Sequence, residues 1–137
     1  HISGPKKIKN ISNLVTKEYP NFPTDLQAQF MVLLCKAKGK SSITESIFEN
    51  RFMHVAELRR LGAEILIKKN KAFISGDTNF QAAELMSSDL RASVALVLAA
   101  IVATGSSTIN RIYHLDRGYE NIENKLRKVG VNIRRVN

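Results

Sequence analysis

Two aspartates stand at matching points of two similar segments of this sequence. Asp25 lies in Thr-Asp-Leu-Gln-Ala and Asp89 lies 64 residues later in Ser-Asp-Leu-Arg-Ala, each just before a long apolar stretch. A carboxylate at such a point could act as a general base or bind a hydroxyl group. Acidic residues in a first helical turn also cap the helix and complement its dipole. The spacing alone favours capping.

Two arginines follow the same repeat. Arg51, in Glu-Asn-Arg, and Arg117, in Leu-Asp-Arg, are 66 residues apart, and both lie in predicted loops between a strand and a helix. α/β proteins bind ligands at the carboxyl ends of their strands, and a guanidinium holds a carboxylate or phosphate through two parallel hydrogen bonds. Surface pairing with the neighbouring Glu49 and Asp116 explains the same positions equally well, so the spacing leaves both interpretations open.

The other reactive side chains indicate no further chemistry. Cys35 lies in an apolar run and is expected to be an unreactive buried thiol. His54 and His114 have no second ligand at metal-binding spacing, and the sequence contains no glycine-rich phosphate or dinucleotide motif. We therefore expect neither a metal nor a cofactor.

Basic residues near both ends of the chain could form a patch for nucleic acid. Such residues are usually solvated when they are spread over helix faces and termini, and here no aromatic residues alternate with them on one strand face. We expect no nucleic-acid partner.

Composition limits the class of protein. The chain has 137 residues, a formal net charge of +9 and 44% hydrophobic residues, which fits one folded domain or a piece of a longer protein and not a disordered basic tail. A single cysteine cannot form an intramolecular disulfide, so a reducing cytoplasm is expected. The longest apolar run, 94–103, is half of the ~20 residues that cross a bilayer, so no membrane segment is expected.

Two long helices must position the aspartates. They are predicted at 24–38, capped by Thr24, and at 89–104, capped by Ser88, and each is followed by a glycine. Their centres have no polar stripe, which indicates helices that meet apolar neighbours on every side. The sequence therefore predicts two interior helices.

Shorter elements surround these helices. Surface helices are predicted at 53–61 and 119–129, each with one apolar face. Lys-Asn-Lys at 69–71 predicts a hairpin, because asparagine tolerates the left-handed conformation of such turns. Strands are predicted at 42–47, 64–68, 72–75, 80–86, 108–113 and 132–136.

The alternation of these elements predicts an α/β fold built from an internal repeat. The two copies, each of the form β-α-β-α-β(β), cover about 14–76 and 77–137. Neither copy can bury both faces of its central helix alone. We therefore expect residues 1–137 to be part of one domain of a longer protein, completed by more copies or by a partner domain.

Four longer motifs carry a family resemblance. They are Phe-Pro-Thr-Asp-Leu-Gln-Ala-Gln-Phe (22–30), Glu-Asn-Arg-Phe-Met-His-Val (49–55), Ser-Asp-Leu-Arg-Ala-Ser (88–93) and Arg-Ile-Tyr-His-Leu-Asp-Arg-Gly-Tyr-Glu (111–120). In this order and spacing they resemble the C-terminal part of the bacterial UDP-N-acetylglucosamine 1-carboxyvinyltransferases. The related shikimate-pathway enolpyruvyl transferase shares the fold, but the second and fourth motifs resemble the cell-wall enzymes.

The resemblance implies a fold and a reaction. Enzymes of this family have two domains, each made of three βαβαββ units around buried helices, an inside-out α/β barrel, so this chain would be two of three units of one domain. They transfer the enolpyruvyl group of phosphoenolpyruvate to the 3-hydroxyl of UDP-N-acetylglucosamine, through a tetrahedral ketal, and release phosphate. This is the first committed step of peptidoglycan synthesis, a cytoplasmic process, and it implies no cofactor.

The resemblance also assigns roles to residues of this chain. Asp25 matches the carboxylate at the sugar hydroxyl, so it is expected to act as the base and to bind UDP-N-acetylglucosamine. Arg117 matches the arginine that binds phosphoenolpyruvate, and Arg51 and Arg91 are placed in the same cluster. Three further residues complete the set: Ile47, whose backbone would contact the UDP-sugar, and Asp89 and Leu90, which would border the site.

Other parts of the family's site lie outside this chain. The Cys or Asp proton donor, a Lys-Asn pair and a further arginine belong to other segments, and Cys35 matches a buried helix position instead. The chain alone is therefore expected to be inactive and to need the N-terminal domain as its partner. Self-association of the exposed helix faces is a further expectation. The alternative hypothesis, from the charge of +9, is a small basic module that binds phosphorylated ligands or RNA without catalysis.

Overall fold

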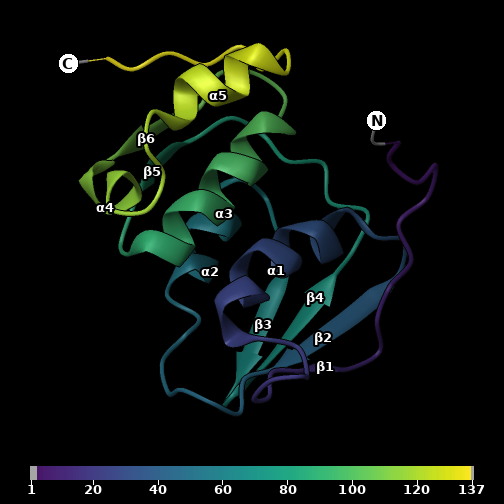
Figure 1. Ribbon diagram of the computed structural model, residues 1–137. Coiled ribbons are helices and arrows are strands. Elements are labelled where there is room, and N and C mark those ends of the chain that lie inside the picture. Colours follow the sequence, from purple (N-terminus) through teal and green to yellow (C-terminus); the bar gives the residue numbers. More distant parts are fainter. Residues whose placement is uncertain (1–2, 137) are drawn as a thin grey trace.

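The first copy of the repeat folds into a four-stranded sheet with helices packed on it (Figure 1). The structure is a computed structural model that describes residues 3–136. In chain order the elements are β1 (Leu14–Val15), the 3-10 turn η1 (Thr24–Leu26), α1 (Gln27–Lys36), β2 (Lys40–Thr44), α2 (His54–Arg60), β3 (Ile65–Lys68) and β4 (Lys71–Ser75). The sheet order is β1-β2-β4-β3, with β1 parallel to β2 and β4 antiparallel to both of its neighbours.

The second copy begins in the same way and ends differently. It contains β5 (Glu84–Met86), α3 (Leu90–Ile101), β6 (Thr108–Asn110), α4 (Tyr113–Asp116) and α5 (Ile122–Lys128). β5 and β6 are parallel, as β1 and β2 are. Each copy thus starts as a strand, a central helix and a parallel strand.

The two copies agree in backbone detail. Gly39 and Gly105, which follow the central helices, have φ of +94° and +96°, and Gly62 and Gly130, which follow the shorter helices, have φ of +98° and +94°. Such values suit glycine, because a Cβ atom would clash there. The repeated glycines therefore end equivalent helices in the same left-handed conformation.

The core lies between the two central helices and the sheet. α3 packs against both α1 and α2 (Figure 1), and Met31, Leu34 and Leu96 are almost completely buried there. Cys35 is also fully buried, as predicted. Burial raises the pKa of its thiol to about 12, against the opposing effects of a hydrogen bond with Thr78 and the charge of Lys36.

One predicted strand is absent, and others are shorter than predicted, among them the one at 42–47, which ends at Thr44. The segment 132–136 forms no strand. Its first-copy counterpart β3 pairs with β4, whereas no described strand lies beside 132–136 to pair with it. The strand predicted at 108–113 ends at Asn110, because Arg111 adopts a left-handed φ of 57° and α4 follows. The strand predicted at 80–86 is confined to β5.

The hairpin between β3 and β4 is confirmed, but its turn differs from the prediction. Lys69, with φ of 54°, takes the left-handed conformation that was expected of asparagine. Asn70 instead bonds the backbone at Glu45, since its carbonyl accepts from the Glu45 N–H at 2.8 Å and its side-chain amide donates to the Glu45 carbonyl at 3.0 Å. The turn is thereby tied to the end of β2.

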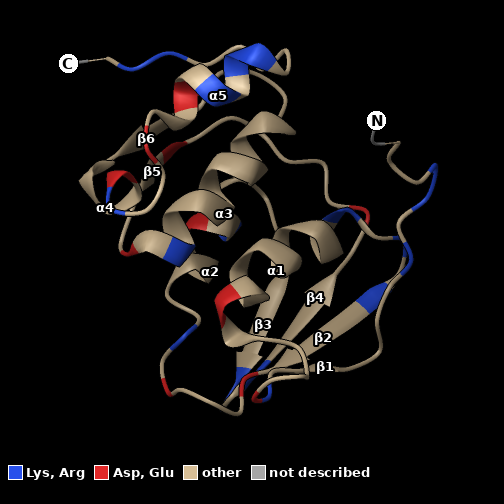
Figure 2. Cartoon of the chain, in the orientation of Figure 1, with Lys and Arg blue, Asp and Glu red and all other residues tan. Residues whose placement is uncertain are grey.

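Positive charge is spread over several elements. Figure 2 shows basic residues in the N-terminal segment, along α5 and in the C-terminal segment, with acidic residues also present in α5. Among the residues described, no helix is long and apolar enough to cross a membrane.

Candidate active site

The two aspartates of the repeat have different partners. Asp89 caps α3, because its Oδ1 accepts the backbone N–H groups of Arg91 at 2.9 Å and Ala92 at 3.0 Å. The predicted cap Ser88 donates its hydroxyl to the Asp89 carboxylate instead. Asp25 lies in η1, which has no side-chain cap, and it accepts a hydrogen bond from Arg91 Nε at 2.5 Å. Capping therefore accounts for Asp89 and not for Asp25.

A second arginine approaches the same carboxylate. Arg51 Nη1 lies 4.0 Å from Asp25 Oδ1, and its guanidinium stacks over the Phe48 ring at 4.3 Å from the centroid. The Asp25 side chain is still 61% exposed, so a ligand can reach it. Within the described residues, the Arg91 guanidinium donates a hydrogen bond only through its Nε. Its two Nη groups are therefore available to bind an anion.

This cluster borders a cavity of about 340 Å³ between the starts of α1, α2 and α3. Two buried polar atoms among its lining residues, Gln27 Nε2 and His54 Nε2, have no hydrogen-bond partner in the described part of the chain. The lining residues are Thr24, Gln27, Ala28, Glu49, Asn50, Arg51, Met53, His54, Asp89, Arg91 and Ala92. Unpaired buried polar atoms are rare in native proteins and call for a partner, so this cavity has the polar lining of a ligand site.

The cavity favours a neutral His54 and a charged Asp89. Burial lowers the pKa of His54 to about 4, although the negative charge of Asp89 opposes the shift. Burial also raises the pKa of Asp89, but the hydrogen bonds from Ala92, Ser88 and Arg91, together with His54, outweigh it and leave the pKa below its usual value. At neutral pH the site thus contains a neutral imidazole beside a charged carboxylate.

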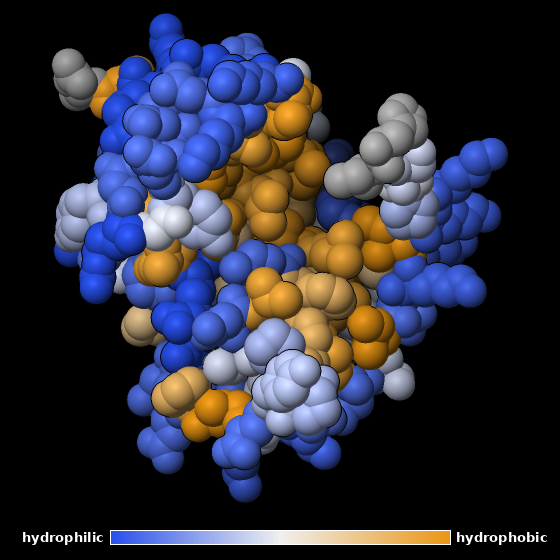
Figure 3. All heavy atoms as spheres, in the orientation of Figure 1, coloured by the Kyte–Doolittle hydropathy of each residue, from blue (hydrophilic) through white to orange (hydrophobic). Residues whose placement is uncertain are grey.

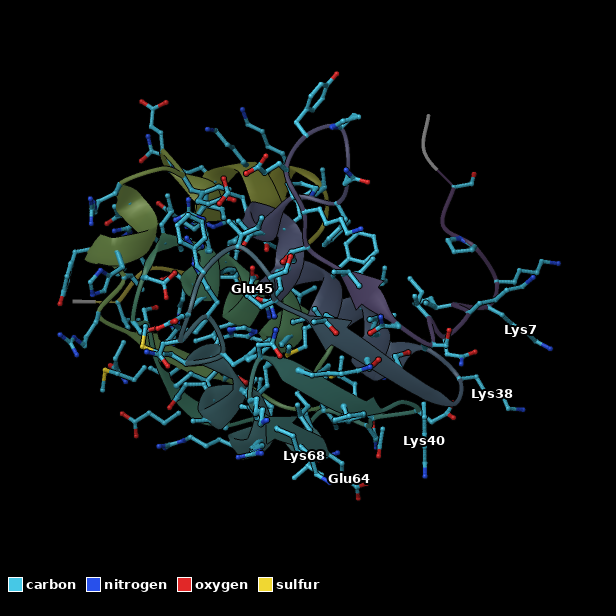
Figure 4. The ribbon with its side chains drawn as sticks, turned by 90° about the horizontal axis from the view of Figure 1, so that it is seen from below. Lys7, Lys38, Lys40, Glu45, Glu64 and Lys68 are labelled. Atoms are coloured by element: carbon cyan, nitrogen blue, oxygen red, sulfur yellow. The ribbon has the colours of Figure 1, made fainter. Side chains whose placement is uncertain are left out.

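Glu45 is a buried acid next to this cluster, and sequence reasoning missed it. Its residue is 3% exposed and its carboxylate accepts hydrogen bonds from Thr16 Oγ1 at 2.6 Å and Thr24 Oγ1 at 2.8 Å. Thr24 therefore does not cap α1, contrary to the prediction. Figure 4 shows Glu45 among the side chains in the middle of the molecule, seen from below. The sequence signal that could have identified Glu45 is a single glutamate within the strand predicted at 42–47.

The remaining predicted residues lie outside the cavity. Ile47 follows β2 in a loop, where its N–H donates to Glu45 Oε1 at 2.9 Å. Arg117 is exposed at the end of α4 and does not pair with Asp116, whose carboxylate is held by Arg135 at 2.8 and 2.9 Å. The structure thus brings Asp25, Arg51 and Arg91 together with the capping Asp89, and it leaves Ile47 and Arg117 apart from the cavity.

Leu90 links the loop of Arg117 to the start of α3. A Cβ atom on Gly118 would lie 2.8 Å from Leu90 Cδ1, so the backbone after Arg117 runs directly against this side chain. Leu90 is half-buried and directly precedes Arg91. The Arg117 loop is therefore anchored beside the helix start that carries Arg91.

The chain is similar to enolpyruvyl transferases over nearly its whole length. The family model for EPSP synthase (3-phosphoshikimate 1-carboxyvinyltransferase) matches residues 2–126. The UDP-N-acetylglucosamine 1-carboxyvinyltransferases of Pelagibacter ubique and Campylobacter hominis are 68% and 59% identical over 99% and 98% of this chain. The chain spans 32% of the length of each of these relatives.

Solved structures agree with this relationship. The enolpyruvyl transferase NikO from Streptomyces tendae matches 95% of this chain and 30% of its own chain, with a TM-score of 0.86 and 28% identity. An EPSP synthase from Acinetobacter baumannii matches 93% of this chain and 28% of its own, with a TM-score of 0.66, and at 15% identity it shows the fold alone. The resemblance read from the four motifs is thus confirmed, and the chain belongs to the EPSP synthase (3-phosphoshikimate 1-carboxyvinyltransferase) family.

Proposed function

We propose that the protein containing this chain transfers the enolpyruvyl group of phosphoenolpyruvate to the 3-hydroxyl of UDP-N-acetylglucosamine. The observation that carries the proposal is the accessible Asp25 carboxylate between Arg51 and Arg91 at the edge of a polar cavity. The relatives at 68% and 59% identity are named for this reaction. The proposal places the protein in the cytoplasm, as part of peptidoglycan synthesis.

Asp25 acts as the base in this proposal. It takes the proton from the sugar hydroxyl while that oxygen attacks C2 of phosphoenolpyruvate, and the methylene carbon gains a proton from a donor outside this chain. Elimination then breaks the bond between C2 and the phosphate oxygen, and one proton leaves the new methyl group, so that phosphate is released and the double bond is restored. Ile47 contributes backbone contact to the UDP-sugar, and Asp89 holds the start of α3 in place.

The arginines bind the anionic substrate in this proposal. Arg51 and Arg91 lie beside the Asp25 carboxylate, where a guanidinium can offer paired donors to phosphate or carboxylate. Arg117 binds phosphoenolpyruvate from the loop against Leu90, and that loop must approach the cavity when substrate binds. Fixed positive charge there stabilises the charge that develops during addition and elimination.

The domain organisation is part of the same proposal. Residues 1–137 supply two of the three βαβαββ units of one domain, about 14–76 and 77–137, and the N-terminal domain supplies the missing groups. The test is phosphate release from phosphoenolpyruvate and UDP-N-acetylglucosamine. We expect release by the full-length protein and none by residues 1–137 alone. A full-length protein that bound UDP-N-acetylglucosamine and released no phosphate would contradict the proposed reaction.

A further inference from the structure

We propose that Glu45 is a positioning residue that joins the two segments carrying Asp25 and Arg51. It touches neither substrate in the proposed function, on which this inference rests. Its carboxylate binds Thr24, the residue before Asp25, and also the backbone of the loop that leads to Arg51. A single buried side chain thereby sets the separation of the base and one of its neighbouring cations.

The contacts divide between the two carboxylate oxygens. Oε1 accepts Thr16 Oγ1 at 2.6 Å, the Ile47 N–H at 2.9 Å and the Phe48 N–H at 3.4 Å. Oε2 accepts Thr24 Oγ1 at 2.8 Å. One oxygen thus orders the loop 47–51, and the other holds the start of η1 that presents Asp25.

The backbone of Glu45 is fixed from the other side. Its N–H and carbonyl both bond to Asn70 in the β3–β4 turn, and the residue directly follows Thr44, the last residue of β2. Thr16, which follows β1, is fully buried. Because these anchors belong to the sheet, the carboxylate ties the two segments that carry Asp25 and Arg51 to the position of the sheet.

The Glu45 carboxylate is buried as an anion, and no arginine or lysine in residues 3–136 forms an ion pair with it. Burial raises the pKa of Glu45, but the hydrogen bonds from Thr16, the Ile47 N–H, Thr24 and the Phe48 N–H outweigh burial and leave the pKa below its usual value. Four donors on one carboxylate are enough to stabilise its charge. Burying a charged carboxylate costs free energy that an apolar residue would not cost. The contacts of this carboxylate are with the segments that carry Asp25 and Arg51, which favours a positioning role over a purely structural one.

The test compares variants of the full-length protein that break different contacts of the same carboxylate. In Glu45→Ala we expect kcat to fall about 10- to 100-fold, because both site segments lose their anchor. In Glu45→Gln the amide oxygen can still accept the three Oε1 contacts and the amide N–H₂ can donate to Thr24, so we expect kcat within about threefold of wild type.

Thr16→Val is the matched control. It removes the hydrogen bond from Thr16 Oγ1 to Oε1 and the bond that the same hydroxyl accepts from the Ser46 N–H at 3.0 Å. The contacts of Glu45 with Thr24, Ile47 and Phe48 stay intact, so the melting temperature should fall while kcat stays within about twofold. Thr24→Val breaks the Oε2 contact and should lower kcat at a similar loss of melting temperature. Equal kcat losses in Thr16→Val and Thr24→Val, or a Glu45→Gln variant as slow as Glu45→Ala, would overturn the positioning role.

Hydrogen exchange separates this inference from the proposed function. The Ile47 and Phe48 amides should exchange faster in Glu45→Ala than in wild type or Thr16→Val, whatever reaction the protein catalyses. Unchanged exchange would overturn the inference while wild-type turnover stands. A wild type without turnover, but with the expected exchange pattern, would count against the proposed reaction and leave the positioning role supported.

Discussion

Asp25 and Asp89 occupy equivalent positions in the repeat, but they interact with different groups and have different roles. Asp89 is tied to backbone N–H groups at the start of α3, so its charge is used for helix capping. Asp25 has no such bond and meets two guanidiniums at an exposed edge. The difference arises because α1 is preceded by the 3-10 turn η1, which moves Asp25 out of the capping position.

Asp25→Asn should therefore damage turnover without damaging the fold. The amide keeps the size of the side chain but cannot take a proton from a hydroxyl, so we expect kcat to fall by about 10²–10⁴. The melting temperature should change little, because the carboxylate is exposed and exposed ion pairs stabilise weakly. Phosphate release and thermal unfolding of the full-length protein measure both quantities.

Lys17→Ala is the control for this variant. Lys17 is exposed and lies outside the cavity, so its kcat should match the wild type. If Asp25→Asn altered only the melting temperature, the base assignment would be wrong.

His54 makes stability depend on pH. Its folded pKa of about 4 lies below the ordinary value of 6.5, so the unfolded chain binds more protons between these values and stability rises with pH across that window. Lowering the pH from 7 to 4 should cost about 3 kcal/mol from this residue. Urea unfolding between pH 4 and 7 measures the slope.

His54→Gln should flatten the slope between pH 4 and 6.5. The lowered pKa values of Glu45 and Asp89 act at lower pH, because their stabilisation is lost only as the pH falls through those folded values. An unchanged slope in His54→Gln would show that another group controls stability in this window.

At the scale of elements, the joint between α1 and β4 depends on one glycine. The Gly76 N–H donates to the Gly39 carbonyl at 2.9 Å, and a Cβ atom on Gly76 would lie 1.9 Å from the carbonyl oxygen of Ala37. The same Cβ would lie 2.4 Å from the Gly39 carbonyl oxygen, and both of these oxygens belong to the backbone and cannot rotate away. The segment after β4 therefore passes the end of α1 at a distance that only glycine permits.

Gly76→Ala should destabilise the protein by about 2–3 kcal/mol or more, because backbone must shift to admit the methyl group. The denaturant midpoint is the measurement. Gly4→Ala is the matched control, since no atom of the described residues lies within 4 Å of the added Cβ, and its free energy of unfolding should stay within about 0.5 kcal/mol of the wild-type value. Equal midpoints for the two variants would contradict the close approach.

Elements whose signals are local could be predicted from the sequence, and those that depend on distant partners could not. The apolar stretches around Leu34 and Leu96 and the glycines after them predicted α1 and α3 within a few residues. The prediction of a strand at 132–136 was wrong, because a strand forms only beside a hydrogen-bonded neighbour and no strand among the described residues pairs with this segment. In the same way, repeated motifs identified Asp25 and Arg51. Glu45 was missed because two of the four hydrogen bonds to its carboxylate come from Thr16 and Thr24, which are far from it in sequence.

At the scale of the whole molecule, the central helices keep an uncovered apolar side. Figure 3 shows hydrophobic residues in a band over α1 and α3. Leu33 of α1 and Leu98 and Ile101 of α3 are each close to 40% exposed. Large exposed apolar surface on a single chain marks a site of contact. Because this chain spans 32% of its relatives' length, we expect another part of the full-length protein to cover these helices.

A cysteine placed on this face tests the expectation by its reactivity. Leu98→Cys should resist a maleimide reagent in the native full-length protein and react in residues 1–137 alone, because only the full-length protein contains the covering segment. Tyr19→Cys is the reference for an open site, since Tyr19 is 97% exposed, and it should react in both. The native Cys35 is fully buried and should stay unlabelled until the chain unfolds.

Peptide mass spectrometry assigns each label, and equal labelling of positions 98 and 19 in the full-length protein would show that this face stays open to solvent. Protection of position 98 in the isolated chain that is lost on dilution would instead identify a second copy of the chain as the cover, since self-association weakens with concentration.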